Sequence, residues 1–192
     1  HAAEITYRRA ISLNANQSNV YLWLAILLQG KGEHEAALNI YDQGTDINPM
    51  WDFLLKNKVI ALANMNNREG AISLQEKLIA KASHDMALQR KRNAELARLH
   101  WSFNNKPEAI AVAKSAGDMG LIKFMNDGDY SLLQKNADRQ YENLVGKSEY
   151  ISQLWMGLEY AHAGARDKAL GCFNSAIALK EAAISLLLIP DF

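Results

Sequence analysis

"YLWLAILLQGKGEHEAALNIY", residues 21–41, decides the fold of this chain. Between Tyr21 and Leu28, apolar residues recur at three- and four-residue spacing, which is the pattern of a helix that buries one face. Gly32 interrupts this pattern, and a second helical pattern then runs from Ala37 through Tyr41. The stretch therefore predicts two helices joined by a tight turn.

The small residue at the start of the second helix recurs along the chain. Ala3, Ala37 and Ala71 are 34 residues apart, and they begin the similar stretches "AEITYRRAISLNA", "ALNIYDQGTDINP" and "AISLQEKLIAKAS". In the first two stretches an aromatic residue follows four positions later, at Tyr7 and Tyr41. Small residues let two helices approach closely, and an aromatic ring fills the space beside them. The spacing predicts a repeated two-helix unit.

Composition limits the class of protein further. The chain has 192 residues, of which 49% are hydrophobic and 22% are charged, so it can bury a core. The formal net charge is zero, which gives no general attraction to nucleic acid or to an anionic membrane. No run of about 18 apolar residues is present, so no membrane span is expected. Alternating strand patterns are hard to find, and we predict an all-α chain.

These features resemble the tetratricopeptide repeat, a unit of two antiparallel helices. Residues 18–51 carry nearly every signature position, and residues 148–181 follow the pattern through Gly157, Tyr160, Gly164, Ala169, Phe173 and Ala176. Residues 52–85 are a degenerate copy, and residues 90–116 form a pair with a lengthened first helix. The resemblance implies a right-handed α-solenoid of about eleven or twelve helices, in which each pair is buried against its neighbours.

The remaining segments complete the expected organisation of residues 1–192 as a single solenoid. Residues 2–14 form a second helix without its first helix, residues 117–147 form an irregular pair, and residues 182–192 form a capping helix. The chain starts at His1 directly in helix-like sequence, so we expect it to be a fragment of a longer protein. Its one cysteine, Cys172, cannot form an intrachain disulfide and does not identify the compartment.

Two segments suggest a wider context. "DYSLLQKNADRQYENL" (129–144) and "ALKEAAISLLLIPDF" (178–192) resemble the ends of tetratricopeptide segments in bacterial multidomain regulators, notably the CadC-like type with a winged-helix domain. The resemblance implies an interaction or sensing role in a transcriptional or signalling regulator. The sequence leaves the location open between the cytoplasm and, if the chain is part of a membrane-anchored regulator, the periplasm.

Motifs for catalysis are weak. A zinc-hydrolase helix needs a second histidine four residues after His34, and Leu38 stands there. Cys172 precedes Phe173 in a repeat helix, where a thiol is usually a small packing residue. The acidic "DGD" at 127–129 lacks the other ligands of a calcium loop. We therefore expect no enzyme activity, no metal site and no cofactor.

The resemblance places ligands on the concave face, which the first helices line. The residues expected there are Leu22, Trp23, Ile26, Phe53, Lys56, Asn57, Ile60, Arg98, Trp101, Leu154, Trp155, Leu158 and His162. Several aromatic and aliphatic groups on one such face indicate a binding groove. The alternative is that the face is filled internally, by helix 84–104, by the apolar segment 180–189 or by upstream repeats.

Two other recognition modes, a carboxylate clamp and nucleic-acid binding, each require particular residues. The carboxylate clamp of chaperone-binding repeats needs Lys and Asn where Leu22 and Ile26 stand, so the clamp is absent. The basic residues between Lys77 and Lys106, including Arg90, Lys91 and Arg92, are interleaved with acidic ones. Consecutive residues point in different directions around a helix, so we interpret these three as solvated rather than as a nucleic-acid site.

The sequence thus predicts a non-catalytic scaffold that binds a protein or peptide in the groove around Trp23, Phe53 and Trp155. No direct binding of nucleic acid or membrane by this segment is expected. Self-association through the helix at 2–14 is a further expectation, because that helix lacks its partner. The alternative function is a small-molecule or signal-sensing helical module without a peptide ligand, which a closed pocket with convergent polar groups would favour.

Overall fold

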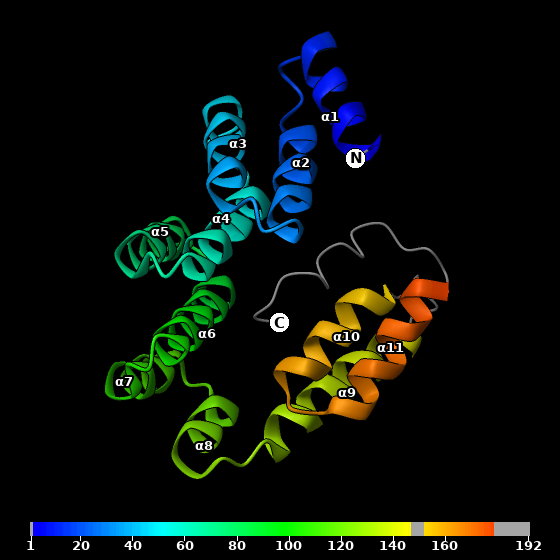
Figure 1. Ribbon diagram of the computed structural model, residues 1–192. Helices are drawn as coiled ribbons and strands as arrows, with labels where there is room; N and C mark the ends of the chain where they lie inside the picture. The colour runs from blue at the N-terminus through cyan, green and yellow to red at the C-terminus, as the bar shows by residue number, and fades with distance from the viewer. Residues whose placement is uncertain (1, 147–151, 179–192) are drawn as a thin grey trace.

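The computed structural model describes residues 2–146 and 152–178, and this part of the chain is entirely helical (Figure 1). The predicted all-α class is confirmed. The eleven helices of the described part are α1 Ala2–Leu13, α2 Ser18–Gly30, α3 His34–Ile47, α4 Asp52–Asn64, α5 Arg68–Lys81, α6 Met86–Ser102, α7 Lys106–Ala116, α8 Met119–Asp127, α9 Ser131–Gly146, α10 Gln153–His162 and α11 Arg166–Ala178.

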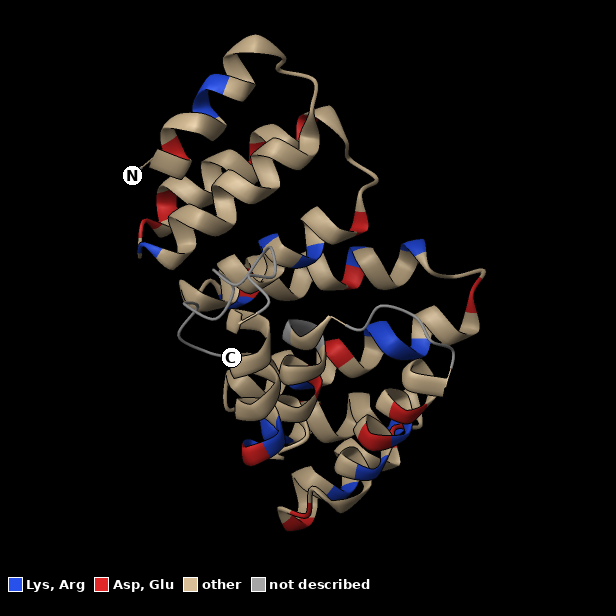
Figure 2. Ribbon diagram, turned by 90° about the vertical axis from the view of Figure 1, so that its right-hand side faces the viewer, with Lys and Arg blue, Asp and Glu red and all other residues tan. Residues whose placement is uncertain are grey.

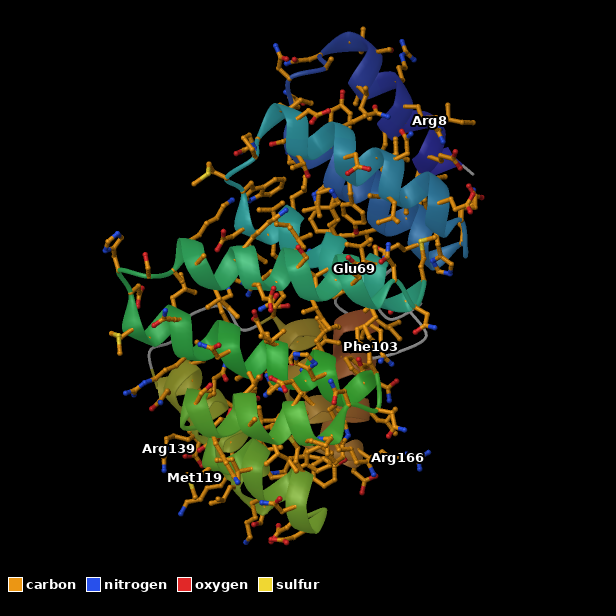
Figure 3. All side chains as sticks on the ribbon, turned by 90° about the vertical axis from the view of Figure 1, so that its left-hand side faces the viewer. Arg8, Glu69, Phe103, Met119, Arg139 and Arg166 are labelled. Atoms are coloured by element: carbon orange, nitrogen blue, oxygen red, sulfur yellow. The ribbon has the colours of Figure 1, made fainter. Side chains whose placement is uncertain are left out.

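Consecutive helices pack against each other along the whole described chain, as expected for a tetratricopeptide-like solenoid. The closest pairs are α2 with α3, α4 with α5, α6 with α7 and α10 with α11. In Figure 1 the helices α3, α5 and α7 lie on the outer side, while α2, α4 and α6 lie on the side that faces α10. Seen from the outer side, α5 presents Glu69 at the front, and Phe103 marks the turn between α6 and α7 (Figure 3).

The turns of these pairs share one backbone conformation. Four residues at the equivalent position have positive φ angles: Gly32 (79°), Asn66 (56°), Asn104 (57°) and Gly164 (68°). Glycine adopts this left-handed region without strain, and asparagine tolerates it better than most residues. In the first turn the N–H of Glu33 reaches back to the carbonyl of Leu28 over 2.9 Å, which closes the end of α2. The same turn recurs even where Asn replaces Gly.

Small and aromatic residues pack as their spacing predicts. Ala37 and Tyr41 are fully buried, and a side chain at Gly44 would meet Leu54 and Tyr21, so glycine allows α3 to approach α2 and α4. The burial of Tyr41 raises the pKa of its phenol, whose O–H donates to the Gln29 side chain. In the last pair, the ring of Phe173 lies directly over the Cα of Gly157.

The described part has two hydrophobic clusters. The first joins α2 to α6, and the second joins α6 to α11. Val112 and Phe173 pack against both clusters, and the fully buried Ala176 of α11 belongs to the first one. The last described helix therefore contributes to the core of the first repeats. Lys and Arg as well as Asp and Glu are spread over the described molecule, although α2 carries none of them (Figure 2).

Candidate functional site

The predicted groove residues fall into two groups by burial. Leu22, Ile26, Asn57 and Leu158 are buried, and the first two belong to the first cluster. The Asn57 amide donates to the Phe53 carbonyl over 2.8 Å, so its polarity serves the helix itself. The partly exposed residues are Trp23, Phe53, Lys56, Ile60, Arg98 and Trp101, and His162 is exposed. The side chains of Leu154 and Trp155 lie outside the described part.

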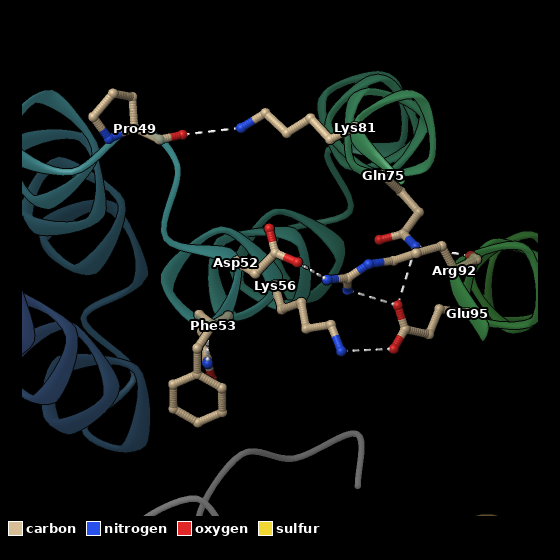
Figure 4. Close-up of polar contacts among 9 residues, drawn as sticks. Pro49, Asp52, Phe53, Lys56, Gln75, Lys81, Arg92 and Glu95 are labelled. Carbon is tan, nitrogen blue, oxygen red and sulfur yellow. Dashed lines mark hydrogen bonds and ion pairs between the residues drawn. The ribbon is translucent and has the colours of Figure 1, made fainter. Parts of the chain in front are cut away.

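A network of charged side chains ties α4, α5 and α6 together behind Lys56 (Figure 4). Lys56 pairs with Glu95 over 2.9 Å, and Glu95 also pairs with Nη1 of Arg92 over 3.0 Å. Nη2 of Arg92 reaches Asp52. Gln75 of α5 donates to the Arg92 carbonyl over 2.9 Å. Two cations and two anions balance here, so the network is electrically neutral as a whole.

The interpretation of Arg92 as a solvated residue is wrong. Arg90 and Lys91 are exposed as expected, but the Arg92 residue retains only 2% of its surface. A signal for this was present, because Leu96 and Leu99 follow four and seven residues later and are both buried. The helical period places Arg92 on that same face, where acidic partners from α4 and α6 compensate its charge.

Trp101 belongs to an aromatic cluster at the junction of α6, α7 and α8. Its ring lies 5.3 Å from that of Phe124, which in turn lies 4.4 Å from that of Tyr130. The Lys106 ammonium sits 5.3 Å from the centre of the Trp101 ring. Tyr130 also packs on Gly164, in the turn between α10 and α11. Trp101 thus has protein partners that hold the second half of the chain together.

Arg98 and His162 are the two predicted site residues that the fold brings together in a cavity. The cavity has a volume of about 180 Å³ and is lined by Arg98, Asp118, Leu133, Asn136, Ala137, Gln140, Glu159, His162 and Ala163. Its apolar floor is buried, whereas the polar groups come from α6, α9, α10 and the start of α8. Asn136 and Gln140 are not among the residues predicted from the sequence, because the irregular pair at 117–147 has no repeat register.

The electrostatics of this cavity act on His162. Although the residue as a whole reaches solvent, desolvation of its ring lowers the pKa of His162, and the nearby Arg98 guanidinium lowers it further. Glu159 opposes this effect. The environment of the ring therefore favours the neutral imidazole over the imidazolium more than water does.

The described residues also bear on metal binding, membrane insertion and the role of the cysteine. No group of three His, Cys, Asp or Glu side chains within 2–146 and 152–178 is arranged to hold a metal ion. Over the same ranges, no helix combines the length and apolar character needed to cross a membrane. Cys172 is partly buried, and it packs against the second cluster.

Self-association through α1 stays a prediction. The helix has no fully buried residue, and it exposes 60% of Ile5 and 78% of Leu13. Its contacts to α2 include an ion pair of 2.8 Å between Glu4 and Lys31. Mass measurements over a range of concentrations would test the prediction, and a monomer at every concentration would contradict it.

The stacked helix pairs, their common turn and their small-to-aromatic packing define a helical-repeat protein. Residues 18–49, which contain α2 and α3, match the family model of the tetratricopeptide repeat. None of the curated proteins matches the sequence. The first complete helix pair is therefore similar to a tetratricopeptide repeat, and repeats of this family generally mediate interactions between proteins.

Proposed function

We propose that this chain is a non-catalytic scaffold that binds a protein or peptide against its first helices. The observation that carries the proposal is the tetratricopeptide match over 18–49, because this family is a protein-interaction module. The packing adds support, since the second helices face outward and the first helices face the interior of the curve (Figure 1). Such a curved array offers an extended concave surface to a partner.

The proposed binding surface, here called the inner face, consists of Trp23 on α2 with Phe53, Lys56 and Ile60 on α4. All four are partly exposed. Aromatic and aliphatic side chains supply most of the binding energy in typical interfaces, whereas the Lys56 ammonium is already paired with Glu95. Buried members of the predicted groove, such as Leu22 and Ile26, support this surface from behind rather than contacting a ligand.

Selection of peptides from a displayed random library on the purified chain tests the proposal. Replacing Trp23 or Ile60 with Ala should weaken binding of the selected peptides by about tenfold or more, because truncating a central interface residue costs over 1 kcal/mol. The matched control is Ile72→Ala, since Ile72 is also partly buried against the first cluster but lies on α5, a second helix. Failure to select any peptide, or equal losses in Ile60→Ala and Ile72→Ala, would count against the inner face.

The proposed setting is a bacterial regulator in which this segment provides interaction or sensing. The support is the likeness of 129–144 and 178–192 to segments of CadC-like regulators. Most of the second segment lies outside the described residues. Sequencing of the region that encodes the chain before His1 tests this setting and the compartment. A winged-helix domain followed by a membrane span would support it, and an unrelated domain there would contradict it.

A second candidate function is the sensing of a small molecule. One observation favours it, namely the cavity in which Arg98, Glu159 and His162 converge with two amide side chains. Convergent polar groups above an apolar floor are the usual composition of a ligand site.

A further inference from the structure

The cavity between α6, α9 and α10 differs from the rest of the described chain because two of its partly buried charged side chains form no ion pair or hydrogen bond. Two of its lining residues, Arg98 and Glu159, are partly buried. Neither forms a hydrogen bond or an ion pair through its side chain with any residue that the structure describes. Their charges act on the neighbouring His162, but neither is neutralised by a contacting partner.

Every other partly or fully buried Lys, Arg, Asp or Glu in residues 2–146 and 152–178 has such a partner. The others form ion pairs, as Lys56 does with Glu95 and Asp138 does with Lys168, or cap a helix, as Asp118 does at α8. The two exceptions line one cavity and carry opposite charges. The charged atoms of these two side chains still reach water, so a ligand of matching charge can replace that water without breaking an existing ion pair.

The geometry points to a small zwitterion as the ligand: we infer that the cavity binds a molecule of amino-acid size, with its carboxylate on Arg98 and its ammonium on Glu159. A guanidinium can bind a carboxylate through two parallel N–H donors, which makes it the preferred group for this role. Glu159 is acceptor-only when ionised, and it therefore suits an ammonium rather than a second carboxylate.

The remaining lining groups fit the same ligand. Asn136 and Gln140 follow one another by one helical turn on α9, so both amides can face the cavity and can donate or accept hydrogen bonds. The buried Leu133, Ala137 and Ala163 leave an apolar floor for a short side chain. Asp118 already accepts from the N–H of Leu121, so its free oxygen can only assist Glu159.

The volume of the cavity, about 180 Å³, indicates a small ligand. This space is smaller than the roughly 300–1,000 Å³ of sites for drug-sized molecules. A molecule of amino-acid size suits a space of this volume. The inference rests on the small-molecule sensing function proposed for this cavity and is independent of the peptide-binding proposal, because the cavity and the inner face share no residue.

The experiment is calorimetric titration of the intact chain with each of the common free amino acids, followed by comparison with half-ligands. At least one amino acid should bind saturably. Its carboxylate-only and amine-only analogues should each bind about tenfold more weakly or worse, because each loses one charged hydrogen-bond contact. Absence of binding by every amino acid, or equal binding by a half-ligand, would overturn the inference.

Variants then locate the site. Arg98→Met and Glu159→Gln should each weaken binding by about tenfold or more, because each removes one charged contact. The matched controls are Arg139→Met and Glu142→Gln, which delete the same charges from exposed positions of α9 outside the cavity (Figure 3 labels Arg139). Losses confined to Arg98→Met and Glu159→Gln support the site, and unchanged affinity in both of these variants contradicts it.

A measurement on the unmodified chain covers the case in which these variants fold poorly. The ring proton signals of His162, assigned by NMR, should shift on addition of the amino acid that binds, because His162 lines the cavity beside both charged groups. The ring proton signals of His84, an exposed residue that precedes α6 and does not line the cavity, should not shift. Binding without any shift at His162 would place the ligand elsewhere and would overturn the inference.

Discussion

The guanidinium of Arg92 on α6 joins Asp52 on α4 to Glu95, which lies one turn further along α6. This contact crosses 40 residues of sequence and fixes the lengthened α6 against the second complete repeat. The Arg92 side chain is almost fully buried, while Asp52 and Glu95 keep 46% and 27% of their side-chain surfaces exposed. Arg92 is therefore the member of the network whose charge depends most on its ion-pair partners, because its side chain has almost no contact with water.

Replacing Arg92 with Met should lower the free energy of unfolding by about 1.5–3 kcal/mol, the usual contribution of hydrogen bonds to charged groups. The loss is not larger because both carboxylates keep solvent, so no unpaired charge is left buried. Urea denaturation at neutral pH measures the loss. Arg92→Lys should not restore stability, because one ammonium cannot span two partners as the guanidinium does.

The control for this prediction is Arg90→Met, two residues earlier on the same helix and exposed. It should change the free energy of unfolding by no more than about 0.5 kcal/mol. Equal stability of Arg92→Met and Arg90→Met would show that the network contributes nothing net.

A second prediction concerns the close approach of α10 and α11. Gly157→Ala should destabilise the last helix pair by about 1–3 kcal/mol, because the new methyl group meets the ring of Phe173. Gly171→Ala, on α11, should instead stabilise by up to about 1 kcal/mol, since nothing lies within 4 Å of the added atom and alanine favours the helix.

Chemical denaturation, followed by hydrogen exchange of α10 and α11, measures both variants. Replacing the Phe173 ring as well, in the double variant Gly157→Ala with Phe173→Leu, should recover part of the lost stability. The leucine side chain can move away from the new methyl group, whereas the rigid ring cannot. A stabilising effect of Gly157→Ala would contradict the packing described for this pair.

A third prediction concerns pH. The pKa of His162 is lowered in the folded state, chiefly by desolvation and then by Arg98. The unfolded chain then binds more protons than the folded chain below an ordinary histidine pKa of about 6.5. The contribution of His162 to stability is therefore complete above about pH 6.5 and is lost as the pH falls through that value toward the folded pKa.

Melting temperatures at pH 7.5, 6.5 and 5.5 measure this effect. Wild type should lose stability over this range, and His162→Gln should show a flatter profile. The exposed His84→Gln serves as the control and should follow wild type. If His162→Gln and wild type had parallel profiles, the lowered pKa of His162 would not contribute to folding.

Several features of the fold could be predicted from the sequence because they are local. Apolar spacing at three and four residues predicts helices, and the positions of Gly32 and Gly164 predict the turns that the structure shows with positive φ. Ala37 and Gly44 show directly where helices approach closely, because only small side chains permit it. The candidate binding face was derived from repeat position alone, and the burial of Leu22 and Ile26 could not be read from it.

The sequence by itself determined the all-helical class, the 34-residue repeat and the match of residues 18–49 to a tetratricopeptide unit, because each depends on contacts within one turn or one helix pair. Only the tertiary structure decided which charged residues are buried and which remain without a partner. Arg92 and Arg98 lie on the same helix, yet Arg92 pairs with Asp52 on α4, whereas Arg98 lines a cavity together with Glu159. The reason is that the partners come from helices distant in sequence, and no local pattern records how far the chain curves to bring them near.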